Sequence, residues 1–143
     1  MSKKLQKSSK AKKFKKSTAR KKLHAMWSES VRQRDGYACQ WCLQDGRRNV
    51  SLKHHAHHIV PRSVSGTTGA FDVDNGITLC YPCHLFRLKS YIDEYIEFRN
   101  KWLAENIYID YITLRDRLKP ITKFTEEFYE QRRLSLVKIR GGK

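Results

Sequence analysis

KHHAHHIVPRSVSGTTGAFDVDNGITLCYPCHLFRL occupies residues 53–88 of this 143-residue chain. Five of the six histidines of the chain lie in it: His54, His55, His57, His58 and His84. The last of them follows a CxxC directly, and a segment rich in Gly, Ser and Thr separates it from the first four. A single asparagine, Asn75, stands at the end of that segment. Side chains that can bind metals or move protons are therefore concentrated in one short part of the chain.

Residue patterns in this stretch predict two strands and a helix. The apolar and β-branched residues of 50–60, closed by Pro61, predict a strand, and residues 76–80 predict a second one. The Gly, Ser and Thr residues between them predict a loop over residues 62–74. Pro82 suits the first turn of a following helix. An apolar stripe at helical spacing extends that helix through Leu85, Leu88, Ile92, Tyr95, Ile96, Trp102 and Leu103.

A further helix is predicted upstream, over residues 19–35. Its apolar residues recur at helical spacing: Leu23, Met26, Trp27 and Val31. Gly36 follows at the position where helices often end with a left-handed residue. The pattern predicts an amphipathic helix that packs on the core.

All four cysteines fall into two CxxC pairs, Cys39 with Cys42 and Cys80 with Cys83. The order strand, loop, strand would bring the second pair back to the first, so that four thiolates close a structural zinc site. With no export signal the chain is expected in the cytosol, where thiols stay reduced and metal binding is favoured over disulfides. The alternative is four unrelated cysteines. In a domain this small, zinc would contribute much of the folding free energy.

The order of these residues resembles the HNH nuclease family. The resemblance rests on His58, Asn75 and His84, with Pro61 after the first histidines and the two CxxC pairs as a second signature, and it covers about residues 34–88. It implies an α+β fold with a small ββα-metal, treble-clef-like core of the zinc-stapled CxxC…CxxCH type. An N-terminal helix and a C-terminal helical extension would flank this core.

The resemblance also implies roles for single residues. His58 would be the general base that takes a proton from water, Asn75 would brace the loop that orients it, and His57 and His84 would hold a divalent cation. An imidazole with a pKa near 6.5 can accept a proton at neutral pH, and a cation can stabilise charge on the leaving 3′ oxygen. Regular strand alternation sends His57 and His58 to opposite faces. Both reach one site only where the strand ends and bends, near Pro61.

The metal ligands depart from the family pattern. Many members have Asp where His57 stands, and some have another histidine one helical turn after the position of His84, where this chain has Phe86, Arg87 and Leu88. Two imidazoles favour zinc, nickel or manganese, although an open, hydrated site also accepts magnesium. The expected cofactors are thus a structural Zn²⁺ and one catalytic divalent cation, Mg²⁺, Mn²⁺, Ni²⁺ or Zn²⁺.

Other polar residues of the stretch have ordinary interpretations. His24, His54 and His55 are interpreted as half-buried histidines without a catalytic role, with DNA contact as the alternative. Asn75 precedes Gly76, and Asn-Gly is a common hairpin signal, so a turn residue is its alternative.

The chain is strongly basic, with 30 Lys+Arg against 14 Asp+Glu and a formal charge of +16. Such a surface attracts polyanions, and nucleic acid is the default partner. Residues 1–22 contain eleven of the basic residues and no acidic one, which predicts a disordered arm that binds phosphates without reading bases. The expected DNA contacts are Lys12, Lys13, Lys15, Lys16, Arg20, Lys21, Lys22 and, in the predicted loop, Arg62. The alternative is a tail that only aids solubility.

Beyond residue 105 the pattern predicts a helix over 107–119, ended by Pro120, and a second helix over 125–133. Residues 134–139 would form a short strand or a frayed helical extension. The predicted organisation is a disordered basic arm (1–22), an HNH nuclease domain (23–105) and a C-terminal helical extension (106–143).

These features together predict a metal-dependent DNA endonuclease that hydrolyses phosphodiester bonds of double-stranded DNA, by nicking or by double-strand cutting. The alternative from another class is a non-catalytic zinc module that binds nucleic acid. An RNA-directed nuclease or a ribosome-associated factor would share the charge and the zinc.

HNH proteins of this kind resemble those of bacteriophages, where they act as homing endonucleases or beside DNA-packaging terminases. Other phage DNA-processing proteins are therefore candidate partners. No apolar run is long enough to span a bilayer, and no secretory signal is present, so we expect no membrane partner. A cytoplasmic location follows, in a bacterial host cell if a phage encodes the protein.

Overall fold

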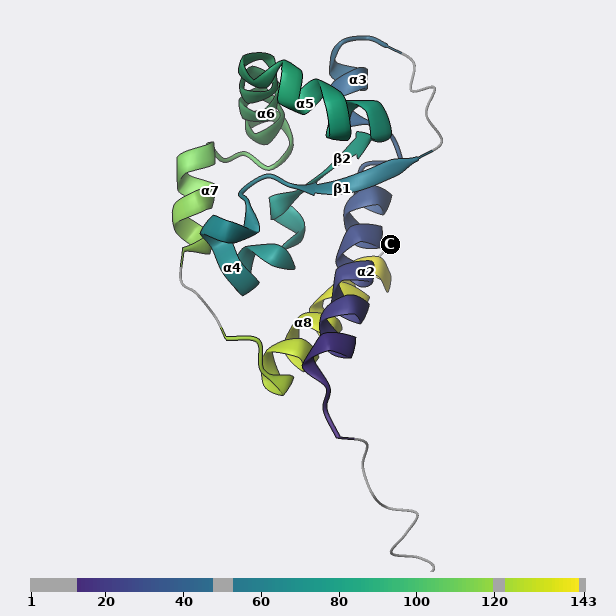
Figure 1. Cartoon of the computed structure of the whole chain (residues 1–143), viewed down its shortest axis with the longest axis vertical. Helices are drawn as coiled ribbons and strands as arrows, with labels where there is room; N and C mark the ends of the chain where they lie inside the picture. The colour runs from purple at the N-terminus through teal and green to yellow at the C-terminus, as the bar shows by residue number, and fades with distance from the viewer. Residues whose placement is uncertain (1–12, 48–52, 120–122, 142–143) are drawn as a thin grey trace, which may run out of the picture.

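A two-stranded antiparallel sheet connects the parts of the fold (Figure 1). The structure is a computed structural model that describes residues 13–47, 53–119 and 123–141. β1 (His54–His58) pairs with β2 (Gly76–Cys80), with His58 opposite Gly76 and His54 opposite Cys80. The predicted second strand is confirmed with its bounds. The first strand is shorter than predicted, because it ends at His58, and residues 50–52 lie outside the described part of the chain.

The connection between the strands is helical where the sequence predicts a loop. α4 (Arg62–Ala70) is followed by a 3-10 turn, η1 (Val73–Asn75), so the loop prediction is wrong for most of residues 62–74. α4 bends at Gly66, whose φ of 56° lies in the left-handed region that favours glycine. Gly, Ser and Thr have low helix propensity. Tertiary contacts override it: a Cβ on Gly69 would lie 2.0 Å from Ser65 Oγ, so this turn packs too closely for a larger residue.

The predicted continuous helix after β2 is interrupted. A π-helical turn, η2 (Cys83–Arg87), leads into α5 (Leu88–Ser90), and the backbone leaves helical geometry at Tyr91 before α6 (Ile92–Asn106). The interruption changes which side of the helix is buried. The buried residues of α6 are Tyr95, Phe98, Trp102 and Leu103. Ile92 and Ile96, predicted for the buried stripe, are exposed instead.

α2 (Lys16–Arg34) and α8 (Glu126–Gly141) pack against each other on one side of the sheet (Figure 1). α2 begins at Lys16 and not at the predicted residue 19, so the prediction of disorder over residues 1–22 is wrong for 16–22. Apolar contacts explain the early start, because the Phe14 ring lies 6.4 Å from that of Phe124 and 5.9 Å from that of Tyr129, between centroids. Residues 1–12 lie outside the described part of the chain.

The C-terminal helices have side-chain caps that fix their starts. The carboxylate of Asp110 accepts a hydrogen bond from the Thr113 amide at 2.7 Å, and α7 (Tyr111–Leu118) follows. The Thr125 hydroxyl accepts one from the Phe128 amide at 3.1 Å, and α8 follows. Because α8 continues through residues 134–139, the alternative of a short strand there is wrong and the helical extension is correct.

Two apolar clusters lie on the two faces of the sheet. Ile77 and Leu79 of β2 belong to the cluster that contains the cysteines and the buried side of α6. The other face receives α2 at close range: a Cβ on Gly76 would lie 2.4 Å from a methyl group of Val31. A small α+β core with two strands followed by a helix is therefore confirmed. Within the described residues, every helix is too short or too polar to cross a membrane.

Candidate functional site

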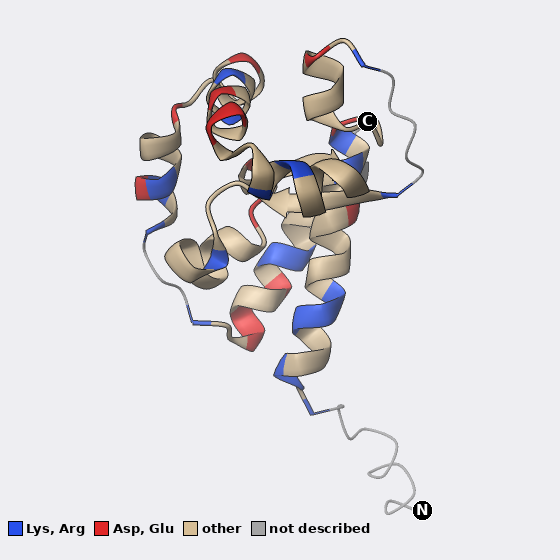
Figure 2. Ribbon diagram, turned by 45° about the horizontal axis from the view of Figure 1, so that its top comes forward, with Lys and Arg blue, Asp and Glu red and all other residues tan. Residues whose placement is uncertain are grey.

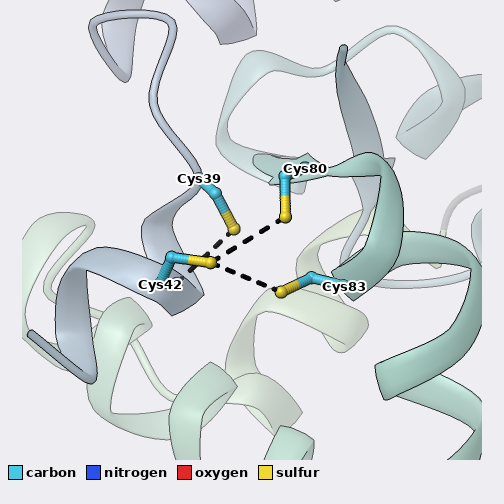
Figure 3. A group of neighbouring side chains, drawn as sticks. All are labelled: Cys39, Cys42, Cys80 and Cys83. Atoms are coloured by element: carbon cyan, nitrogen blue, oxygen red, sulfur yellow. Dashed lines mark hydrogen bonds between the residues drawn. The ribbon is translucent and has the colours of Figure 1, made fainter. Parts of the chain in front are cut away.

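The four cysteines meet in one buried cluster (Figure 3). Cys39 caps α3 (Gln40–Gln44), which contains Cys42, whereas Cys80 ends β2 and Cys83 begins η2. The four Sγ atoms all lie within 4.8 Å of one another, and that of Cys42 is 3.8 Å from Cys80 and 3.7 Å from Cys83. Sulfurs about 2.3 Å from one tetrahedral zinc ion would be about 3.8 Å apart. The predicted meeting of the two CxxC pairs is confirmed, and the cluster fits structural zinc.

The charges of this cluster also favour a cation. A hydrogen bond from Cys83 lowers the pKa of Cys39 to about 5, whereas burial raises the pKa of Cys42 to about 12. Only a cation would allow all four thiols to ionise, because metal binding is coupled to their deprotonation. Arg87 adds positive charge from outside, with Nη1 3.9 Å from Cys83 Sγ and the guanidinium 3.8 Å from the ring centroid of Trp41.

His57 and His58 point to opposite faces of β1. His57 pairs with Ile77, on the face of the cysteine-containing cluster, and His58 pairs with Gly76, on the face that receives α2. Cross-strand partners share a face, so the pairing fixes the direction of each side chain. Because His58 is the last residue of the strand, both side chains still line one groove.

Two contacts fix the imidazole of His58. The Trp27 indole stacks on it with a centroid distance of 4.1 Å and an interplanar angle of 7°. Its Nε2 lies 2.9 Å from the carbonyl oxygen of Ala70. A carbonyl can only accept, so Nε2 carries the proton, and Nδ1 of the neutral ring keeps a lone pair. Burial lowers the pKa of His58 below the ordinary 6.5, so the ring is neutral at pH 7.

His84 lies between two histidines of β1. Its ring centroid is 5.1 Å from that of His55 and 5.1 Å from that of His57, and its Nδ1 is 2.9 Å from Nδ1 of His55. Nε2 of His57 contacts the Tyr95 hydroxyl at 3.0 Å. Burial lowers the pKa of His57 to about 3 and also lowers that of His84. Both rings are therefore neutral at pH 7, and a nitrogen lone pair of each could bind a metal ion.

Sequence reasoning missed two members of this group, His55 and Tyr95. The interpretation of His55 as an ordinary half-buried histidine overlooked one signal: residues two apart on a strand share a face, which puts His55 beside His57. Tyr95 belongs to the predicted buried stripe of the helix, and no local pattern indicates that its hydroxyl reaches His57.

Asn75 joins the two ends of the connection between the strands. Its Oδ1 accepts from the Val60 amide at 2.7 Å, and its Nδ2 donates to the carbonyls of Val60 and Gly69 at 3.0 and 2.9 Å. These bonds tie the segment after His58 to the end of α4, next to Ala70. The alternative of an Asn-Gly hairpin turn does not apply, since Asn75 ends η1 and is fully buried.

A groove of about 670 Å³ runs over the histidines. α2, β1, the start of α4 and His84 form its walls, and none of the described residues that line it is acidic. A second hollow of about 750 Å³ shares His24 and Arg62 with the groove and adds Arg20 and Lys21. The two hollows together form a positively charged surface that leads to His58.

The predicted DNA contacts lie partly on this surface. Arg20, Lys21 and Arg62 line the second hollow. Lys13 and Lys15, before α2, and Lys16 and Lys22, in its first two turns, are exposed. Figure 2 shows basic residues along the N-terminal half of α2, and the first turn of this helix contains no acidic residue. Lys12 lies outside the described residues.

Comparison with known families identifies this region. Residues 39–86 match the family model described as HNH endonuclease. No curated protein and no solved structure gives a significant match to the chain. The matched segment contains both CxxC pairs, both strands and the histidines of the groove except His24. Residues 39–86, with their cysteine cluster and their two strands followed by a helix, are thus the part of the chain that is similar to the HNH endonuclease family.

Proposed function

We propose that the protein is a metal-dependent DNA endonuclease. The observation that carries the proposal is the environment of His58: a neutral imidazole, fixed by Trp27 and Ala70, in a groove that also contains His57 and His84. Such a residue suits a general base, because its orientation is fixed and it is unprotonated at neutral pH.

In the proposed mechanism, Nδ1 of His58 takes a proton from the water that attacks the scissile phosphate. The bond from Nε2 to the Ala70 carbonyl keeps the ring in the tautomer that this step requires, and it stabilises the imidazolium that forms. The stacked indole of Trp27 prevents the ring from rotating out of the groove.

His57 and His84 would hold the catalytic divalent cation, which stabilises the charge that develops on the leaving 3′ oxygen. Both are neutral, and imidazole nitrogens are common ligands of zinc and nickel. Asn75 acts as a positioning residue, because its three side-chain hydrogen bonds tie the backbone after His58 to the end of α4.

Duplex DNA would approach along the basic surface beside the groove. Arg62 lines both hollows, and Arg20 and Lys21 extend the positive charge along α2. Cations at these positions would contact phosphates and would place a backbone segment near His58 without reading bases. Lysines of residues 1–12 would add further phosphate contacts.

The opposing proposal is a non-catalytic zinc module that binds nucleic acid. It shares the cysteine cluster and the basic surface, but it gives no reason for an oriented, neutral His58 beside two further histidines. Homing cleavage and terminase-associated cleavage in a bacteriophage are the biological roles that the family resemblance implies, and other phage DNA-processing proteins are the partners proposed with them.

Incubating supercoiled plasmid with the purified protein and Mg²⁺, Mn²⁺, Ni²⁺ or Zn²⁺ tests the proposal. We expect nicked or linear products from the wild type and none above background from His58→Ala, which should still bind DNA and keep its zinc. His54→Ala is the matched control on the same strand. Equal cutting by the wild type and His58→Ala would refute the assignment of the base. A parallel RNA substrate separates the RNA-directed alternative.

A further inference from the structure

His55 occupies the same side of β1 as His57. It pairs with Leu79, and His57 pairs with Ile77, so both histidines face the cluster that contains the cysteines. η2 brings His84 to this face, where its ring meets both others edge to face with centroids 5.1 Å apart. Three imidazoles from two segments, 29 residues apart between His55 and His84, therefore lie along one wall of the groove, although among the described residues only the four cysteines bring three or more ligand atoms within 4.8 Å of one another.

The nitrogens of His55 and His84 are placed as two ligands of one ion would be. Their Nδ1 atoms lie 2.9 Å apart. Two nitrogens about 2.1 Å from one metal ion are separated by about 3.0 Å at neighbouring octahedral positions and by about 3.4 Å at tetrahedral ones. The donor set is purely imidazole, because the described residues that line the groove include no carboxylate.

We propose that His55 is a third protein ligand of the catalytic cation, together with His57 and His84. This inference rests on the proposed function, and it adds both a residue and a metal preference. Three imidazole nitrogen ligands without a carboxylate favour Ni²⁺, Co²⁺ or Zn²⁺ over Mg²⁺. His55 would thus replace the histidine that some family members have one helical turn after the position of His84. This chain has Arg87 and Leu88 there.

The competing explanation is a hydrogen bond between the imidazoles of His55 and His84, with His55 packed edge to face against Tyr81 at 5.9 Å between ring centroids. In that case His55 would position His84 but would not bind metal. A carboxylate in place of His55 separates the two explanations. It can bind a cation, and it favours harder ions, but it cannot reproduce the packing of an imidazole ring.

The test is a calorimetric titration of Ni²⁺, and separately of Mn²⁺, into zinc-loaded full-length protein without DNA. The variants are His55→Ala, His55→Asp and His84→Ala, with His54→Ala as control. Far-UV circular dichroism and zinc content confirm that each variant is folded. We expect the wild type and His54→Ala to bind one Ni²⁺ per chain beyond the zinc.

His55→Ala should weaken Ni²⁺ binding at least about tenfold, the loss that even an outer partner of a metal ligand causes. His55→Asp should retain binding and raise the affinity for Mn²⁺ relative to Ni²⁺. Unchanged Ni²⁺ binding by His55→Ala, with loss in His84→Ala, would overturn the role of His55 and leave the proposed function intact. Equal weakening by His55→Ala and His55→Asp would likewise exclude a ligand. Absence of a second ion in the wild type would overturn both proposals.

Discussion

The indole of Trp27 lies parallel to the imidazole of His58, at 4.1 Å between centroids and 7° between planes. This contact links α2, outside the residues that match the family model, to the proposed general base. The indole itself is fixed, because its Nε1 donates to the Asp72 carbonyl at 2.7 Å. α2 is therefore part of the wall that orients His58.

Trp27→Phe should destabilise the protein and slow cleavage. The smaller ring loses the bond to Asp72 and leaves space in a fully buried site, which should cost about 1–3 kcal/mol of unfolding free energy. His58 would then be less well oriented, so the cleavage rate at saturating DNA should fall while DNA affinity changes little. Urea denaturation and single-turnover kinetics measure the two effects. Tyr108→Phe, at a site 85% exposed, is the control.

Asn75→Asp should be strongly destabilising although it is almost isosteric. A carboxylate can still accept from the Val60 amide, but it places negative charge against the carbonyls of Val60 and Gly69, which now receive the Nδ2 protons. Loss of a buried, fully bonded amide should cost about 2–4 kcal/mol. Thermal denaturation beside Asn100→Asp, at an exposed position of α6, checks this. Equal melting temperatures would argue against a bracing role.

The pH dependence of cleavage should have its acid limb below pH 6.5. Burial lowers the pKa of His58 from this ordinary value, so the base stays unprotonated as the pH falls below 6.5 and is lost only at more acidic pH. The lowered pKa of His57, about 3, affects protein stability in the same direction. The free energy of unfolding is not reduced by this group above pH 6.5, and it falls as the pH drops from 6.5 toward 3. Single-turnover rates from pH 5 to 8 measure the limb. A limb above pH 6.5 would contradict this environment of His58.

The structural zinc should be independent of the histidines. A His57→Ala, His84→Ala double variant should still contain about one zinc per chain, because four thiolates complete a closed site. Cys42→Ser should lose this zinc and much of the fold, since zinc binding and folding are coupled. Metal analysis and circular dichroism of both proteins test this, and a double variant without zinc would show that the histidines share the ion.

Deleting residues 1–12 tests the basic arm without cutting into α2. The deletion removes five lysines but leaves Phe14 and its contacts with Phe124 and Tyr129. If the arm binds phosphates, affinity for an unrelated duplex should fall, and the log-log salt slope should flatten by about 0.9 for each phosphate that is no longer neutralised. The rate at saturating DNA should stay near that of the full chain. An unchanged slope would identify the segment as a solubility tail.

The sequence by itself determined those features of the protein that depend on residues close together in the chain. Two CxxC pairs predicted the cysteine cluster, because the spacing places both sulfurs of a pair on one ion. Alternation within β1 predicted that His57 and His58 point to opposite faces. The order of His58, Asn75 and His84 indicated the family that residues 39–86 match.

Tertiary structure decided what depends on contacts between distant segments. Glycine and serine composition argues against a helix at residues 62–70, yet Asn75 and close packing at Gly69 stabilise one there. The early start of α2 depends on Phe124 and Tyr129, more than a hundred residues away. His55 became part of the site only because η2 brings His84 onto its face of the sheet. No local pattern contains these contacts, since each exists only when two remote segments have already folded together.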